Sequence, residues 1–221
     1  MWDEQLIRFH RQLSLQAKIP KGIEVLHPYR DEYTMSLCAR FFKKYYHDNK
    51  PRKLLLGINP GRFGSGITGI SFTDPVRLEN DCGIPNHFDK RGELSSDFIY
   101  RMIAAYGGPA DFYARQLISA ASPLGFVQMG KNINYYDNPK LQQAVAPFIV
   151  ESISALMKMG CDRKKGFCIG EGKNFAFLAD LNQKHGWFDE VVSLAHPRFI
   201  MQYKRKQLSA YIDRYLAALA D

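Results

Sequence analysis

Two short segments of the chain carry residues that could do chemistry, and the first is LLLGINPGRFG at residues 54–64. It places Asn59 directly after an apolar run and before Pro60 and several glycines. Glycines let backbone approach a ligand closely and proline stiffens a turn, so the loop could hold a ligand. The pattern GxxxxGK[ST] does not occur here, which argues against a P-loop of the kind that binds nucleotide phosphates. Asparagine after a strand commonly caps a turn, and for this stretch alone we prefer that structural interpretation.

The second segment begins with His196 and Pro197 and continues as RFIM over residues 198–201. The histidine could be a core residue or a ligand to a bound molecule. Basic and apolar residues exposed together at a loop tip are unusual. They could form a wedge that enters a base stack, with the arginine near a phosphate or a groove. Alternatively, the C-terminal helix starts here, and Ile200 or Met201 packs on a sheet.

Both segments follow predicted strands. Four short runs are continuously apolar or small, which is typical of parallel strands buried on both faces; they cover residues 53–58, 117–122, 166–170 and 190–195. Helical patterns separate them, at residues 27–49, 95–107, 109–116, 138–160, 172–186 and 202–221, after an amphipathic N-terminal helix. Ser95 and Ser96 are candidate N-caps. The pattern predicts an α/β fold, a three-layer α/β/α sandwich with a short four-stranded, mostly parallel central sheet, in a single domain over residues 1–221.

Ligands of such folds bind beyond the carboxyl ends of the strands. Asn59 and His196 each follow a predicted strand at that end. The stretch at residues 73–94 is polar and rich in Pro and Gly, so we expect a long loop that is functional or mobile.

Composition suggests a polyanionic partner. The chain has 30 Lys and Arg against 22 Asp and Glu, a net charge of +8, and nucleic acid is the commonest partner of such a surplus. The four cysteines form no CxxC pair, which argues against a zinc ribbon or an iron–sulfur cluster and favours buried free thiols. No apolar stretch is long enough to span a membrane, and the charged N-terminus does not resemble a secretory signal, so we expect a cytoplasmic protein.

The two segments together resemble the uracil-DNA glycosylase superfamily. Within it the chain is most similar to the single-strand-selective monofunctional uracil-DNA glycosylases, in a divergent bacterial branch. The matching positions are Gly57, Asn59, Pro60, Gly61, Phe63, Gly64, Thr68, Gly69, Phe72, His196 and Pro197. Residues 122–132, SPLGFVQMGKN, resemble the family's C-P-L-x-F…G-R-N stretch. The mismatch-specific uracil/thymine group shares GINPG but has an asparagine-proline second motif, and is a weaker match.

The resemblance implies roles for individual residues. Asn59 would position the attacking water and His196 would donate a hydrogen bond to the carbonyl oxygen of the departing base. Phe72 would stack on the flipped base. The backbone near Ile58 would add a donor, and Gly61 and Phe63 belong to the same base-binding loop. No lysine is assigned to a Schiff base, so we expect hydrolysis without strand cleavage.

One base-binding position departs from the family. An asparagine that reads the edge of uracil commonly stands three residues before the proline of C-P-L, where this chain has Ala120. Without that amide the pocket is expected to be less selective and to admit xanthine, hypoxanthine or oxidised pyrimidines.

The second motif departs as well, since the family often reads HPSPRN. The DNA-wedge role is carried over to Arg198, Phe199 and Ile200. Further predicted DNA-backbone contacts are Lys131, Asn132 and Lys204.

The leading hypothesis is a monomeric DNA glycosylase that starts base excision repair on damaged DNA, without cofactor, metal or membrane. Two alternatives stay open: a catalytically silent relative that binds damaged DNA, and a hydrolase of free nucleosides. Asn59 and His196 argue against the first. The net charge and the RFIM segment argue against the second.

Overall fold

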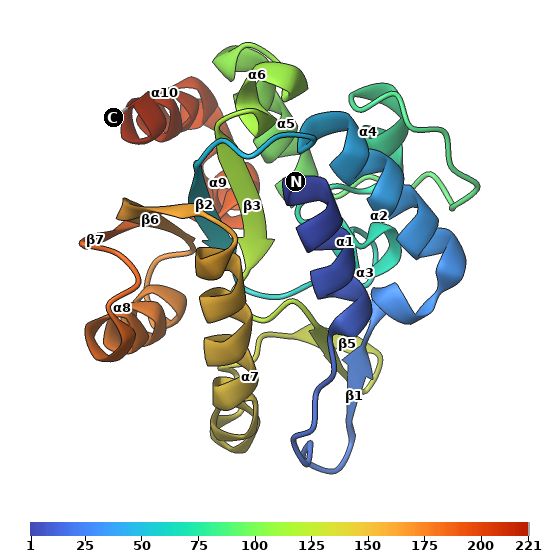
Figure 1. The fold of residues 1–221 in the computed structure, drawn as a ribbon, viewed down its shortest axis with the longest axis vertical. Coiled ribbons are helices and arrows are strands. Elements are labelled where there is room, and N and C mark those ends of the chain that lie inside the picture. Colours follow the sequence, from blue (N-terminus) through green and yellow to red (C-terminus); the bar gives the residue numbers. More distant parts are fainter. Residues whose placement is uncertain (221) are drawn as a thin grey trace.

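The computed structural model describes residues 1–220 and is built on a four-stranded parallel sheet (Figure 1). The strand order is β3-β2-β6-β7, and every neighbouring pair is parallel. The strands are β2 (Arg52–Gly57), β3 (Gln116–Ala120), β6 (Cys161–Ile169) and β7 (Glu190–Leu194). These are the four predicted strands. Leu54, Leu55 and Leu56 of β2 are all buried, as a continuously apolar run in a covered parallel sheet should be.

Helices cover the sheet on both faces. The crossover from β2 to β3 and the crossover from β3 to β6 run in opposite directions along the sheet. Because such crossovers are right-handed, their helices lie on opposite faces. The first crossover carries α3 (Ser65–Thr68), α4 (Pro75–Asn80), α5 (Leu94–Tyr106) and α6 (Pro109–Tyr113); the second carries α7 (Pro139–Lys158). The predicted three-layer sandwich is therefore confirmed.

The remaining helices complete these layers. Helix α8 (Lys173–His185) contacts β6 and β7, while α9 (Pro197–Tyr203) and α10 (Leu208–Ala220) contact α5. The predicted C-terminal helix over 202–221 is thus two helices joined by a 3₁₀ turn, η2 (Arg205–Gln207), and its last residue lies outside the described residues. Before the sheet come α1 (Trp2–Gln12), η1 (Pro28–Arg30) and α2 (Glu32–Tyr45).

A second sheet was not predicted. Strands β1 (Ile23–Leu26), β4 (Gly125–Gln128) and β5 (Lys131–Ile133) form an antiparallel sheet in the order β1-β4-β5. Most of residues 122–132, the stretch that resembles C-P-L-x-F…G-R-N, forms the β4–β5 hairpin of this sheet. In Figure 1 the small sheet lies beyond the arrowhead of β3, at the carboxyl end of the central sheet. It therefore borders the edge where ligands bind.

The segment over residues 73–94 is more ordered than a loop. Asp74 caps α4 by accepting a hydrogen bond from Arg77 N at 2.9 Å, and its other oxygen accepts one from Glu93 N at 2.8 Å. Glu93 is the N-cap residue of α5, so the predicted caps Ser95 and Ser96 lie inside the helix. The prediction was wrong because the carboxylate of Asp74, far away in sequence, determines where the chain enters α5.

The N-terminal helix is attached to the sheet through Arg52. This fully buried guanidinium donates to Asp48 Oδ1 at 2.7 Å and Oδ2 at 3.0 Å, and lies 5.6 Å from the ring centre of Trp2. All four cysteines are free and buried, as predicted. Among the described residues, no helix is both long and apolar enough to cross a membrane.

Candidate active site

Asn59 follows β2 and is oriented by the end of the small sheet. Its Oδ1 accepts a hydrogen bond from Tyr135 N at 3.0 Å, and its Nδ2 donates to Ile133 O at 3.2 Å and, more weakly, to Pro60 O at 3.4 Å. A carboxamide oxygen has two acceptor sites. With one taken by Tyr135, the other remains for a water molecule, on a side chain whose rotamer is already determined.

His196 follows β7 and caps α9. Its Nδ1 accepts a hydrogen bond from Arg198 N at 3.1 Å, so Nδ1 carries no proton and Nε2 does. Burial, with a smaller contribution from the Arg198 charge, lowers the pKa of His196 to about 4. At neutral pH the ring is therefore an uncharged donor at Nε2. Such a group can stabilise negative charge on a neighbouring oxygen without transferring a proton.

Phe72 lies beside His196. Its ring centre lies 6.2 Å from that of His196, with 52° between the planes. Its edge packs on Gly57, where an added Cβ would lie 2.7 Å from Phe72 Cε2, so only glycine fits. The backbone of Phe72 has φ of 53°, a region that costs a non-glycine residue about 1–3 kcal/mol and recurs at functional sites.

The turn before Phe72 is held by Thr68. This buried hydroxyl donates to Thr73 O at 2.6 Å and accepts from Ile70 N at 3.2 Å. Ile70 precedes Phe72 and Thr73 follows it, so the hydroxyl binds the backbone on both sides of Phe72. The strained residue is thereby supported by the structure around it.

A buried network holds Tyr135, the residue whose N–H orients Asn59. Tyr135 OH donates to Asn174 Oδ1 at 2.6 Å, and Asn174 Nδ2 donates to Cys168 Sγ at 3.2 Å. A Cβ on Gly170 would lie 3.5 Å from Asn174 Nδ2 and 3.7 Å from His196 Cδ2, so Gly170 lies beside both side chains. Sequence reasoning missed Tyr135 and Asn174. No local pattern distinguishes them, since their partners are distant in the chain.

Glu93 and a group of arginines surround the rest of the glycine-rich loop. The Glu93 carboxylate lies against Gly64, and burial followed by the charge of Asp74 raises its pKa. Phe63 lies between two guanidinium groups, with Arg62 4.9 Å and Arg91 3.6 Å from its ring centre. These charges were not predicted, and they surround the loop that carries the proposed water-positioning residue.

The remaining predicted base-binding residues lie at the same edge. Ala120 is the last residue of β3, buried and paired in register with Gly57. Ile58 O accepts a hydrogen bond from Ser122 N at 3.1 Å. A Cβ on Gly61 would lie 3.1 Å from Asn132 Nδ2, so β5 also packs against this residue.

The predicted DNA contacts divide into two groups. Most are exposed side chains that could reach a ligand: Lys131, Asn132, Arg198, Phe199 and Lys204. Ile200 is different, because it lies in α9 and is completely buried. Its inclusion in the wedge was wrong, since a helix turns residues 200 and 201 towards the core and leaves 198 and 199 outside.

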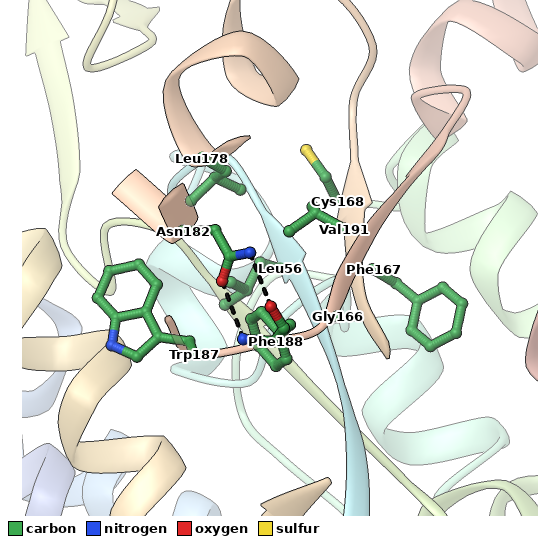
Figure 2. A pocket seen from close by; sticks show the side chains of 9 residues that line it. All are labelled: Leu56, Gly166, Phe167, Cys168, Leu178, Asn182, Trp187, Phe188 and Val191. Atoms are coloured by element: carbon green, nitrogen blue, oxygen red, sulfur yellow. Dashed lines mark hydrogen bonds between the residues drawn. The ribbon is translucent and has the colours of Figure 1, made fainter. Parts of the chain in front are cut away.

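A small cavity elsewhere has too little room for a base. It has a volume of about 10 Å³ and lies between β6, β7 and α8, beside Phe167, Trp187 and Val191. Figure 2 shows Asn182 holding the Phe188 backbone next to it through two hydrogen bonds of 2.9 Å each. Room for at most about one water molecule identifies it as a packing void. Within residues 1–220, no three His, Cys, Asp or Glu side chains are grouped to hold a metal ion.

Comparison with known proteins identifies the family. The family model described as the uracil DNA glycosylase superfamily matches residues 43–220. Among solved structures, the chain is similar to the crystal structure of wild-type Pedobacter heparinus SMUG2, with a TM-score of 0.97, 44% sequence identity, and coverage of 99% of this chain and 97% of that one. A search of curated proteins found no match. The resemblance inferred from the two motifs is confirmed: the chain belongs to the uracil DNA glycosylase superfamily and is a hydrolytic DNA N-glycosylase.

Proposed function

We propose that the protein removes uracil from DNA by flipping the nucleotide into the space bordered by Asn59, Phe72 and His196. The main observation that supports this proposal is the position of the His196 ring next to Phe72. Its Nδ1 accepts a hydrogen bond from Arg198 N, which leaves Nε2–H free to donate. Flipping is required because the glycosidic bond is inaccessible in a stacked duplex. The aromatic ring then supplies the stacking surface that the base has lost.

The reaction breaks the C1′–N1 bond and leaves negative charge on the base. Nε2–H of His196 would donate to the base carbonyl oxygen as that charge develops. Removing one such preorganised donor typically costs about 10²–10³-fold in kcat. Asn59 would orient a water whose oxygen attaches to C1′, while a proton from water ends on the departing base. An amide is a very poor base, so Asn59 contributes positioning.

The range of excised bases follows from Ala120. An alanine at the end of β3 offers no amide to read the edge of uracil. The buried amide of Asn174 does not replace it, since it is 0% exposed and hydrogen bonded to Tyr135 and Cys168. We propose that the enzyme also accepts xanthine, hypoxanthine or oxidised pyrimidines.

A gel assay tests the proposal. Labelled oligonucleotides with one uracil, xanthine or hypoxanthine are incubated with enzyme and then treated with alkali. Cleavage only after alkali is expected, because no lysine is assigned to strand cleavage. Retained DNA without cleavage would indicate a silent binding protein, and release of uracil from free deoxyuridine but not DNA would indicate a nucleoside hydrolase. Unchanged activity in both Asn59→Ala and His196→Ala would overturn the mechanism.

A further inference from the structure

The β4–β5 hairpin has an unusual residue at its tip. Gln128 pairs with Lys131, so the loop consists of Met129 and Gly130 alone, with φ of 47° and 69°. A two-residue hairpin loop with positive φ at both positions is a type I′ turn, in which asparagine, aspartate or glycine normally takes the first position. An ordinary L-residue in the left-handed region costs about 1–2 kcal/mol. The stability of the fold would therefore be greater with asparagine, aspartate or glycine at position 129.

Packing does not explain the methionine either. Its side chain is 91% exposed, the largest value among the exposed large hydrophobic residues of the described chain. Within residues 1–220, the only other non-glycine residue with positive φ is Phe72 of the proposed base pocket. Since backbone strain of this kind concentrates at functional sites, a role in binding is the remaining explanation.

The hairpin is held against the catalytic loop. Arg62 N donates to Asn132 Oδ1 at 3.1 Å, and Ile133 O accepts from Asn59 Nδ2 at 3.2 Å. A Cβ on Gly130 would lie 4.0 Å from Arg62 Nη1, so the turn itself is next to a cationic side chain. The exposed Lys131 adds a second positive charge. An exposed apolar side chain in a turn that also carries cations suits DNA, which offers bases to contact and phosphates to pair with the cations.

We infer that Met129 is an apolar DNA contact that enters the base stack beside the flipped nucleotide. Methionine is unbranched and polarisable, which suits it to the uneven faces of bases, and it occurs among the apolar wedges of DNA-binding proteins. Arg62 and Lys131 would neutralise the flanking phosphates. The inference rests on the proposed function, because it requires DNA at this edge.

Met129→Asn separates binding from folding, because asparagine is the favoured residue in the turn. Its Tm should equal or exceed that of the wild type, while Kd for a duplex with a tetrahydrofuran abasic site should rise about tenfold, in the range of one lost base contact. Met129→Leu should keep wild-type affinity. Val25→Thr is the matched control, an exposed apolar residue of β1 in the same small sheet, and should leave Kd unchanged.

A 2-aminopurine placed beside the abasic site reports insertion directly. Wild-type enzyme should change its fluorescence on binding, and the change measured at saturating enzyme should be clearly smaller for Met129→Asn and Met129→Gly. The salt dependence of Kd should keep its slope in Met129→Asn, because no phosphate contact is removed. Affinity of Met129→Asn within twofold of wild type, or equal losses in Val25→Thr, would overturn the inference. Absence of uracil excision by the wild type would instead refute the proposed function, since abasic-site binding is measured without base removal.

Discussion

Tyr135 donates its backbone N–H to Asn59 Oδ1 at 3.0 Å, while its hydroxyl lies 2.6 Å from Asn174 Oδ1. A single residue thus orients the proposed water-positioning amide and links it to the buried side chain of Asn174. Uncharged hydrogen-bonding groups thus orient the side chains of Asn59 and His196.

Asn59→Ala should lower kcat by about 10²–10³-fold, a loss of the size seen for preorganised polar groups. Stability should fall by about 1–3 kcal/mol, because the variant leaves Tyr135 N–H and Ile133 O without this hydrogen-bond partner. Single-turnover kinetics on uracil-containing DNA and a thermal melt measure the two effects. Asn134→Ala, in the same segment but bonded to Asp137, is the control and should keep its activity. Equal losses in both variants would contradict the assigned role.

Stability should fall as pH decreases from about 6.5 towards 4. Burial lowers the pKa values of His196 and His10 to about 4, so the unfolded chain binds protons that the folded chain does not. Their contribution to stability is fully present above pH 6.5 and declines as pH falls through that window. The Tm measured from pH 7 to 4.5 tests this. His196→Asn, which keeps a cap for α9, should reduce the slope and leave the part due to His10; an unchanged slope would contradict it.

Gly57→Ala should strongly reduce kcat/KM for uracil-containing DNA. The new Cβ would lie 2.7 Å from Phe72 Cε2, so the ring must move away from His196. Gly92→Ala is the control, because its Cβ would meet only Asp74 Oδ2 at 4.0 Å. Steady-state kinetics of both variants measure the effect. Wild-type kcat/KM in Gly57→Ala would show that the position of the ring does not matter.

Ala120→Asn should narrow the range of excised bases. An amide at the end of β3 would restore a group able to read the edge of uracil, so excision of xanthine and hypoxanthine should fall relative to uracil. A reaction series on matched oligonucleotides gives the ratios of kcat/KM. Ala121→Ser, at the next buried position, controls for an added polar atom. Identical ratios in Ala120→Asn and wild type would refute the explanation of broad specificity.

Phe199→Ala and Ile200→Ala should have opposite phenotypes although the residues are adjacent. Phe199 is 41% exposed and Ile200 is 0% exposed. Phe199→Ala should weaken DNA binding and keep the Tm. Ile200→Ala should cost about 2–5 kcal/mol of stability, as truncations of buried isoleucine do. Fluorescence anisotropy and denaturant titration measure the pair; destabilisation by Phe199→Ala would contradict the assignment of α9.

The central sheet could be predicted because each of its strands contains a short apolar run, although β6 begins five residues before the predicted run at 166–170, with charged residues that periodicity did not assign to a strand. The small sheet could not, since β5 has only three residues, two of them exposed, and depends on pairing with β4. Asn59, Phe72 and His196 were identified through two local motifs. Tyr135, Asn174 and Glu93 were missed because their roles come from contacts with distant segments. Ile200 was assigned to the wedge because residues 197–201 were read as a loop where α9 forms, and the alternative in which Ile200 packs in the core is the one that the structure has.

The shortness of β5 has a consequence for how the enzyme recognises its substrate. Ile133, which orients Asn59, is only two residues from Lys131 and four from Met129. If the turn binds DNA as inferred, DNA binding and the orientation of the proposed water-positioning Asn59 depend on the same few peptide bonds. A free nucleoside has no neighbouring bases or phosphates for the turn to contact. The enzyme would then reject it through lost alignment as well as through weaker binding.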